Sequence, residues 1–521
     1  MLRLNRSGLE KPAEWLEKGY ALPGYDREAM RKAAESDPVW VHFGAGNIFR
    51  AFLCASAQKL LNEGGMHSGI TAAEGYDYEI IEKCCRPCDD YTLLVTLRAD
   101  GSIAKEVIGS IAASYALDRE NADDFASMRA VFRSPSLQMA SFTITEKGYA
   151  LTPSVMADIA LGPDKTQSYL GKVASLLYER WQAGCPPIAM VSMDNCSHNG
   201  DKLKAAMLAF ADGWGDAGFS RYVHEHVTFP WTMIDKITPR PDAGVEEMLH
   251  CDGLDGLETV VTGKGTYIAP FVNAEESEYL VVEDDFPAGR PPLEEAGVIF
   301  TDRATVDRVE RMKVCTCLNP LHTALAIFGC LLGYTRISEE MKDADLVRLV
   351  RRIGYDEGLP VVTNPGVIDP RAFIDTVVNV RLPNPFMPDS PQRIATDTSQ
   401  KIAIRFGETI KAYIAGSKSG SLPLRAIPFV LAGWLRFLMA VDDNGVPFTL
   451  SSDPMTEALR PIISTLHLGQ KPDADHLLPL LKEKAIWGVD LTECELSGIV
   501  LKDLEFMMQG LGAVRTALQH L

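Results

Sequence analysis

The sequence lacks the features that mark membrane-bound, exported and repetitive proteins. No apolar run approaches the roughly 18–20 residues that a membrane-spanning helix needs. Residues 1–33 alternate charged and small apolar side chains, without the continuous apolar core of a signal peptide. No internal repeat or low-complexity tract is present. We therefore expect a cytoplasmic protein that does not act at a membrane.

Positive charge is also scarce. The 521 residues include 51 Lys and Arg against 70 Asp and Glu, which gives a formal net charge of −19 at pH 7. This balance argues against binding DNA or RNA, because nucleic-acid binding requires clustered positive charge. If the substrate is an anion, local Arg and Lys side chains must bind it against the overall field.

The cysteines form neither a disulfide framework nor a complete zinc site. Their number, 11, is odd, and they are scattered from Cys54 to Cys494. The one dense cluster, Cys84, Cys85 and Cys88, lacks the nearby second pair of Cys or His that a zinc site would need. We expect structural thiols and no bound metal, with a zinc enzyme as a rival hypothesis.

The chain contains two regions with different secondary-structure patterns, and its length suits two large domains. Short apolar runs alternate with helical patterns at first, which predicts a mostly parallel sheet covered by helices on both faces. A Pro- and Gly-rich stretch follows at 285–292, and strand signals nearly vanish after about residue 299. We predict an α/β Rossmann-like domain at residues 1–298 and a mostly α-helical domain at 299–521. Strands are expected at 39–43, 70–73, 91–97, 139–145 and 187–192, and C-terminal helices at 306–334, 339–353, 371–380, 397–415, 424–441 and 453–466.

A glycine loop joins the first expected strand to a helical pattern. In dinucleotide-binding folds, the first glycine permits the tight turn and the second lets the backbone approach the pyrophosphate at the helix N-terminus. Gly44 and Gly46 match these roles, with Asn47 and Ile48 completing the predicted contact. The third glycine of the common pattern is absent, and Arg50 could add charge to the phosphate contact.

An acidic residue ends the second expected strand. Such a residue usually binds the ribose hydroxyls and excludes a 2′-phosphate, so Glu74 favours NAD over NADP. Two alternatives remain: Glu74 is simply a solvated strand end, or Asp77 has the ribose role.

The segment 312–322, MKVCTCLNPLH, places a lysine, an asparagine and a histidine in apolar surroundings. Oxidation of an alcohol needs a base for the hydroxyl proton and donors for the oxygen. A buried lysine such as Lys313 can be that base, while Asn319 can donate to the oxygen and His322 can orient hydroxyls. The alternative is structural: Asn319 caps the following helix and His322 is a core residue.

Several ordered blocks make the chain similar to a known family. They are GAGNIFR at 44–50, TITEKGY at 143–149, SMDN at 192–195 with NG at 199–200, FPWTMIDKITP at 229–239, VEDDFP at 282–287 with GRP at 289–291, and DTSQK at 397–401. Over residues 38–440 the sequence resembles the polyol-specific long-chain dehydrogenases, the mannitol dehydrogenase family. The resemblance implies an N-terminal Rossmann domain, a helical C-terminal domain, NAD as cofactor and a metal-independent mechanism.

The resemblance also implies roles for individual residues. Lys313 resembles the family's general base, and Asn195 and Asn319 resemble its oxyanion donors. The residues that resemble substrate-binding residues are His322, Asp235, Arg393 and Lys401, and Glu146 resembles a residue near the catalytic lysine, on a proton path.

One departure from the family pattern concerns the spacing of two of these residues. Five residues separate Lys313 from Asn319, where the family usually has four. One extra residue rotates the rest of an α-helix by about 100°, and Pro320 disfavours a helix interior. We therefore predict a bulge or break near residues 315–319 that restores the geometry.

The substrate is less sharply predicted. The blocks at 143–149, 227–239 and 399–401 look like fructuronate reductases, which favours interconversion of D-mannonate and D-fructuronate. Asp389 with Arg393 resembles the mannitol 2-dehydrogenases, and residues 44–52 and 422–425 resemble tagaturonate reductases. Arg393, Lys401, Arg405 and Lys236 are the cations available to a sugar acid. A non-catalytic nucleotide sensor is the alternative of another class, and a monomer or a dimer is expected.

Overall fold

The computed structural model describes residues 2–416 and 422–521, which form two compact units. Unit 1 runs to Arg98 and continues over Ser102–Asp307, and unit 2 comprises Ala99–Gly101 and Arg308–Leu521. The main division therefore falls a few residues beyond the boundary predicted at 298/299.

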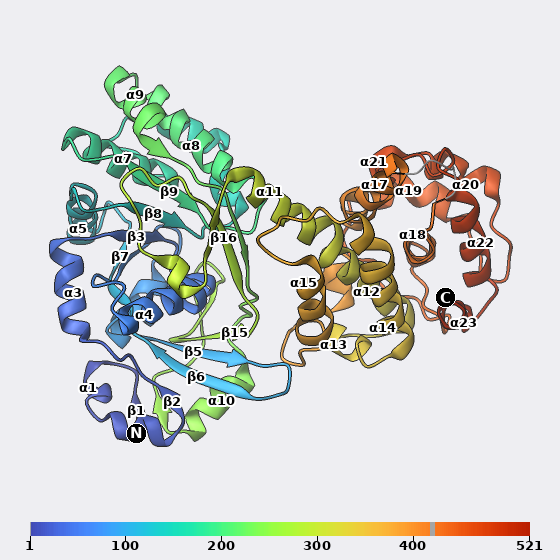
Figure 1. Cartoon of the computed structure of the whole chain (residues 1–521), viewed down its shortest axis with the longest axis horizontal. Coiled ribbons are helices and arrows are strands. Elements are labelled where there is room, and N and C mark those ends of the chain that lie inside the picture. The colour runs from blue at the N-terminus through green and yellow to red at the C-terminus, as the bar shows by residue number, and fades with distance from the viewer. Residues whose placement is uncertain (1, 417–421) are drawn as a thin grey trace. The chain divides into compact units, whose positions relative to one another are not determined.

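Unit 1 is built around a six-stranded sheet whose paired strands all run parallel. Its order is β10-β9-β8-β3-β4-β7 (Figure 1). Numbered along the chain, this is the 3-2-1-4-5-6 order of a Rossmann fold. The strands are β3 (Trp40–Phe43), β4 (Ile70–Glu74), β7 (Ile111–Ala116), β8 (Met139–Phe142), β9 (Ile188–Ser192) and β10 (Val227–Thr228).

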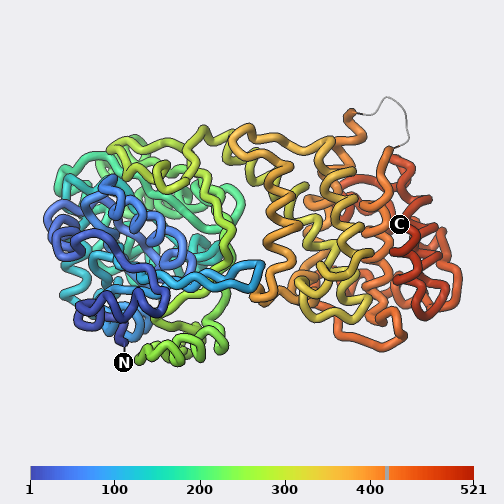
Figure 2. The backbone as a smooth tube through the Cα atoms, turned by 60° about the horizontal axis from the view of Figure 1, so that its bottom comes forward, coloured from blue at the N-terminus to red at the C-terminus, as the bar shows by residue number. Residues whose placement is uncertain are grey.

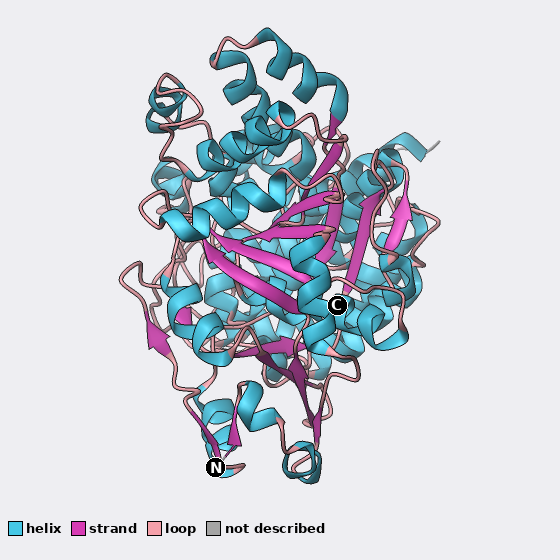
Figure 3. Ribbon diagram, turned by 90° about the vertical axis from the view of Figure 1, so that its left-hand side faces the viewer, coloured by secondary structure: helices cyan, strands magenta, loops and turns pink. Residues whose placement is uncertain are grey.

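Helices cover both faces of this sheet, as Figure 3 shows with strands in magenta and helices in cyan. Trp40 packs with α3 and α4 on one face, while Val41 and Phe43 pack with α5, α7, α8 and α9 on the other. The four residues of β3 are all buried, as expected for a strand covered on both sides. The helices of unit 1 are α1 (Arg6–Leu9), α2 (Pro12–Glu17), α3 (Arg27–Ser36), α4 (Cys54–Glu63), α5 (Ala122–Phe132), α6 (Pro153–Ile159), α7 (Tyr169–Gln182), α8 (Asn199–Gly213), α9 (Ala217–His226) and α10 (Ala243–Cys251).

Two smaller mixed sheets were not expected from the sequence. The predicted strand at 91–97 forms as β5 (Thr92–Leu97), but it belongs to the sheet β15-β5-β6-β2 and not to the parallel sheet. Its short connection to β6 (Ile103–Ile108) makes an antiparallel hairpin (Figure 2), because a parallel pair would need a long crossover. The other strands of this sheet are β2 (Tyr20–Ala21) and β15 (Phe271–Glu275). The second small sheet consists of β11 (Thr232–Asp235), β16 (Tyr279–Glu283) and β17 (Ile299–Thr301). Two short pairs complete unit 1, β1 (Leu2–Arg3) with β12 (Leu254–Asp255) and β13 (Val260–Val261) with β14 (Tyr267–Ile268).

Unit 2 is helical, which confirms the predicted fold class of an α/β Rossmann-like domain followed by a mostly α-helical one. Within its described residues the only β pairing is one isolated bridge, between Val441 and Pro447. Helix α11 (Arg303–Met312) leads into it. The helices that follow are α12 (Asn319–Leu332), α13 (Ile337–Glu340), α14 (Ala344–Arg351), α15 (Pro370–Thr376), α16 (Pro391–Ile394), α17 (Glu408–Gly416), α18 (Ala426–Phe437), α19 (Thr456–Ile463), α20 (Ala474–Leu481), α21 (Lys484–Trp487), α22 (Ser497–Met507) and α23 (Ala513–Gln519).

One helical run in the described chain is long and apolar enough to cross a membrane by length and composition. This run, Arg303–Leu332, comprises α11, α12 and the turn between them, and 83% of its most apolar window is buried inside the structure. Such burial is typical of a core helix.

Candidate active site

The glycine loop lies where the order of the parallel sheet reverses, between β3 and β8. The backbone of Gly44 has a φ of +103°, which strains any residue with a side chain. A Cβ atom at this position would lie 2.3 Å from the carbonyl oxygen of Thr143, which follows β8. Gly44 is therefore required both by its backbone conformation and by the close approach of the neighbouring segment.

The second glycine of the loop leaves open space. A Cβ atom at Gly46 would meet nothing within 4 Å. Directly after it, the π-helical turn η1 (Phe49–Leu53) starts the helical run that continues as α4. Open space at a helix N-terminus on the carboxyl edge of a parallel sheet suits a pyrophosphate, so these residues fit a dinucleotide. Ile48 is partly buried and packs against the core beneath.

Arg50 lies below the loop, with an exposed fraction of 2%. Its guanidinium donates to the Ala269 carbonyl at 2.8 Å and to Asn47 Oδ1 at 3.1 Å. Asn47 in turn donates to the Pro239 carbonyl at 3.1 Å. In this arrangement Arg50 braces the loop from within the protein, whereas the sequence suggested a direct phosphate contact.

Glu74 ends β4 and is also turned toward the loop. Its carboxylate accepts hydrogen bonds from the backbone N–H of Ala45 at 2.9 Å, Tyr76 at 2.8 Å and Asp77 at 3.2 Å. The side chain is 5% exposed, and burial raises its pKa. The alternative of a solvated strand end is therefore wrong. Asp77 is 3% exposed and accepts from Thr262 Oγ1 at 2.6 Å, so both acids have protein partners, and the ribose role of Glu74 stays a prediction.

Asp194 holds the TITEKGY segment against the end of β9. It accepts from the backbone N–H of Ile144 and Thr145, both at 2.9 Å, and from the Tyr149 hydroxyl at 2.5 Å. Burial raises the pKa of Asp194. The segment's Glu146 is exposed, and its carboxylate forms an ion pair with Lys202 at 2.9 Å. Lys202 is not one of the predicted site residues, so this ion pair does not join Glu146 to them.

Asn199 connects the two segments of unit 1 that carry predicted substrate contacts. Its fully buried amide donates to the Asp194 carbonyl at 3.0 Å and the Thr232 carbonyl at 3.1 Å, and accepts from the Thr232 N–H at 3.0 Å. It thereby fixes the exposed Asn195 relative to β11, which ends at the buried Asp235. Sequence reasoning quoted Asn199 within a motif but missed this role.

In unit 2, the turn that carries Lys313 is a π-helix, η6 (Lys313–Cys317). The Leu318 N–H donates to the Lys313 carbonyl, five residues earlier, at 3.1 Å. This wider turn absorbs one extra residue and so confirms the bulge predicted near 315–319. Lys313 is 3% exposed.

Asn319 opens α12 without capping it. The N-cap is Leu318, whose backbone leaves the helical region at φ −127° and ψ −61°, and no side-chain cap hydrogen bond forms. Pro320 lies in the first turn, where its missing N–H costs nothing. The structural alternative for Asn319 therefore fails, and its partly buried amide is not used in capping.

His322, one turn along α12, lies among charged groups. Its Nε2 is 3.5 Å from an Asp389 carboxylate oxygen, and this nitrogen is buried without a hydrogen-bond partner. Burial lowers the pKa of His322 to about 4, opposed by Asp389 and assisted by Arg405 and Arg393. The ring is neutral at pH 7. His322 therefore does not fit the structural alternative, a core histidine whose ring nitrogens both have hydrogen-bond partners.

The two predicted cationic contacts have partners. Arg393 in α16 forms an ion pair with Asp389, one turn earlier. The Lys401 ammonium donates to the Thr396 carbonyl, and its pKa is lowered by burial and by Arg405. Unit 2 thus gathers His322, Arg393 and Asp389 in one cluster, with Lys401 and Arg405 affecting its charge.

The cysteine cluster lies beside the glycine loop. Cys84 and Cys85 pack in one apolar cluster with Ala45. Burial raises the pKa of all three thiols, that of Cys88 to about 12, which keeps them protonated. Over residues 2–416 and 422–521, no group of three or more Cys, His, Asp or Glu is arranged to hold a metal ion.

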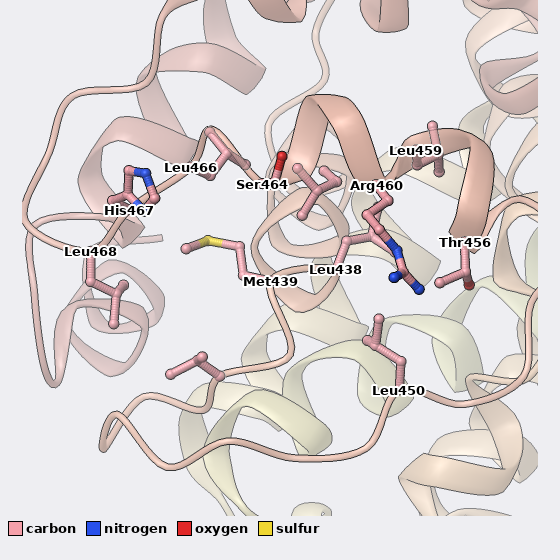
Figure 4. A pocket seen from close by; sticks show the side chains of 12 residues that line it. Leu438, Met439, Leu450, Thr456, Leu459, Arg460, Ser464, Leu466, His467 and Leu468 are labelled. Atoms are coloured by element: carbon pink, nitrogen blue, oxygen red, sulfur yellow. The ribbon is translucent and has the colours of Figure 1, made fainter.

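A separate pocket of about 490 Å³ lies in unit 2, between the end of α18 and α19 (Figure 4). Its lining includes Leu438, Met439, Leu459, Arg460 and His467. None of the predicted site residues lines it.

Comparison with known proteins supports the predicted family. Residues 39–295 match the mannitol dehydrogenase Rossmann domain, and residues 305–508 match the mannitol dehydrogenase C-terminal domain. A D-mannonate oxidoreductase of Thermotoga maritima is 47% identical, over 100% of this chain and 99% of the relative.

Two solved structures are similar over nearly the whole chain. A D-sorbitol dehydrogenase in substrate-free form has a TM-score of 0.80 at 26% identity and covers 96% of this chain and 97% of its own. A Pseudomonas fluorescens mannitol 2-dehydrogenase, in a ternary complex with NAD and D-mannitol, has a TM-score of 0.71 at 27% identity and covers 100% and 99%. The resemblance seen in the sequence is confirmed, and the protein belongs to the mannitol dehydrogenase family, with the two domains of a dehydrogenase of that family.

Proposed function

We propose that the protein interconverts D-mannonate and D-fructuronate with NAD as cofactor. The observation that carries this proposal is the full-length relative named D-mannonate oxidoreductase, at 47% identity. The mannitol 2-dehydrogenase that binds NAD shares the fold over the whole chain, which supports NAD. Tagaturonate reduction and mannitol oxidation are the alternative substrates of the same site, and a non-catalytic sensor would not need the lysine, asparagine and histidine set.

The glycine loop is the part of unit 1 that would hold the cofactor. Gly44 and Gly46 let its backbone approach the pyrophosphate, Asn47 and Arg50 hold the loop in shape, and Glu74 fixes Ala45. When bound there, NAD would supply the hydride acceptor that oxidation of the substrate alcohol requires.

The remaining chemistry is assigned to the other predicted site residues. Lys313 removes the hydroxyl proton, and its burial is what a lysine general base requires. Asn195 and Asn319 donate to the substrate oxygen as negative charge develops on it. His322 enters as a neutral ring, because burial lowers its pKa to about 4, and so it can both accept and donate hydrogen bonds. Asp235, Arg393 and Lys401 bind substrate hydroxyls, and Glu146 lies on a proton path. No step needs a metal.

A substrate screen that follows NADH absorbance tests the proposal. D-Fructuronate, D-tagaturonate and D-fructose are reduced in parallel, with D-mannonate oxidation as the reverse assay. We expect the highest kcat/KM with D-fructuronate. A higher value with D-tagaturonate or D-fructose would reassign the substrate, and activity lost in chelator would remove the metal-independent mechanism. We further expect the protein to be cytoplasmic. We also expect a monomer or a dimer, and size-exclusion chromatography with light scattering can measure this oligomeric state.

A further inference from the structure

The four cations that the sequence offers to a sugar acid differ in what they bind. Arg393 pairs with Asp389, and Lys236, in unit 1, pairs with Glu278. Lys401 donates to a backbone carbonyl. Arg405 is the exception, because no carboxylate in the described residues forms an ion pair with it. Its one hydrogen bond goes to the Thr323 hydroxyl.

The position of Arg405 ties it to the predicted catalytic segment. It lies in the π-helical turn η11 (Ala403–Gly407), which leads into α17 and packs against η6 and α12. Thr323, which accepts from Arg405, donates to the Asn319 carbonyl at 2.9 Å. The guanidinium is therefore anchored at the start of α12, through Thr323, which follows His322 in the sequence and also bonds the Asn319 carbonyl.

The charge of Arg405 is not compensated by the protein. Burial lowers its pKa to about 10, and no acidic group opposes this shift. Arg405 in turn lowers the pKa of Lys401 and of His322 through its positive charge. Arg405 is partly buried, and a positive charge held partly out of solvent without an ion-pair partner marks a candidate site for an anionic ligand.

We propose that Arg405 is the specificity-determining residue that binds the carboxylate of an acyclic sugar acid. The planar guanidinium matches a carboxylate with two parallel N–H donors, whereas a neutral polyol gives it no counter-charge. Lys401, four residues earlier, adds positive charge to the same subsite. This inference rests on the proposed function, since it names the group that selects a sugar acid over a polyol.

The test compares Arg405→Gln and Arg405→Lys with the wild type. As a matched control we choose Arg460→Gln, because Arg460 is 67% exposed and pairs only with Glu457 through its side chain. We expect Arg405→Gln to lower kcat/KM for D-fructuronate by about 10- to 100-fold, mainly through KM, and to change kcat/KM for D-fructose less than about threefold. Arg405→Lys should recover part of the loss, and Arg460→Gln should match the wild type.

A binding measurement separates recognition from catalysis. D-Mannonate should raise the Tm of the wild type and of Arg460→Gln but not that of Arg405→Gln, while D-mannitol should not distinguish the three. If the folded Arg405→Gln variant keeps the wild-type ratio of kcat/KM for D-fructuronate over D-fructose, Arg405 does not bind the carboxylate, and the proposed function stands. If the wild type itself does not reduce D-fructuronate, the proposed function is wrong and this inference falls with it.

Discussion

A fully buried histidine in unit 1 and a partly buried one in unit 2 show how differently the two units use the same side chain. In unit 1, His42 lies in β3 with its ring nitrogens 2.7 Å from Ser141 Oγ and 2.9 Å from Thr143 Oγ1. Its ring stacks on Phe49 at 4.0 Å between centroids. In unit 2, His322 has a buried Nε2 without a hydrogen-bond partner and lies among Asp389 and several arginines.

The difference extends to the surrounding residues. Around the glycine loop, the buried Glu74 and the partly buried Asp194 each accept three hydrogen bonds from the protein. Around His322, the imidazole and Arg405 keep hydrogen-bonding capacity that the described residues do not use. The carboxylates beside the loop thus have their hydrogen-bond partners within the protein, whereas the cluster of unit 2 keeps unused hydrogen-bonding capacity for the proposed substrate. Substitutions in the first region should change stability, and substitutions in the second should change activity.

The largest expected effect is on the activity side. Lys313→Ala should lower kcat by about 10²–10⁴-fold, because it removes the proposed general base. The loop of unit 1 is untouched, so NADH affinity, measured by fluorescence, should not change. Lys342→Ala is the control, because Lys342 is 68% exposed and pairs with Glu339. Turnover retained by Lys313→Ala would disprove the mechanism.

On the stability side, the two glycines of the loop make a matched pair. Gly44→Ala should destabilise the protein by about 2–4 kcal/mol, since the new Cβ meets the Thr143 carbonyl in a strained backbone conformation. Gly46→Ala should leave the stability of the free protein unchanged, because its Cβ enters open space, yet weaken NAD binding by about tenfold. Urea unfolding and NAD titration measure the two effects, and equal losses of stability would contradict the geometry.

Substituting either histidine should have a smaller effect, on stability for His42 and on activity for His322. His42→Gln should cost about 1–3 kcal/mol of stability, because the hydroxyls of Ser141 and Thr143 lose their partners. His322→Gln should leave stability nearly unchanged and lower kcat/KM by about tenfold. Finding the reverse assignment in denaturation and steady-state kinetics would mean that the two regions have been distinguished wrongly.

The smallest effect is the dependence of stability on pH. Burial lowers the pKa of His42 to about 3 and that of His322 to about 4, below the ordinary value of 6.5. The unfolded chain therefore binds protons first, and stability that is present above pH 6.5 is lost as the pH falls toward these values. Each histidine should cost about 1 kcal/mol between pH 6 and 5. In urea titrations at both pH values, each His→Gln variant should lose less stability than the wild type.

The sequence predicted the parts of this molecule that depend on local pattern. The strand and glycine turn before Phe49 and the helical pattern after residue 299 follow from local spacing, the bulge after Lys313 follows from a departure from the family pattern, and all are present. What it could not predict depends on contacts between distant segments. Arg50 is turned inward because the Ala269 carbonyl, 219 residues away, accepts from it, and Glu74 is held by Ala45.

The same limit applies to the candidate site. Residue types identified Arg393, Lys401, Arg405 and Lys236 as equal candidates for an anion, because a sequence does not show which cations already have a partner. The pairs Arg393–Asp389 and Lys236–Glu278 separate them. The small sheets containing β5 and β11 were missed for a related reason: β5 pairs with β15, and β11 with β16, across long stretches of the chain.

The π-turn at Lys313–Cys317 has a consequence for how this chain can vary. A residue inserted into a core helix normally turns every later side chain toward a new neighbour, so that a single codon would disrupt the packing of the whole of α12. Here the surplus is confined to one turn, and Leu321, Leu325 and Phe328 still lie buried in the core. An insertion or deletion of one residue in this turn can therefore leave the core packing of α12 intact. Such a change would alter the spacing between Lys313 and Asn319 without moving the buried side chains of α12.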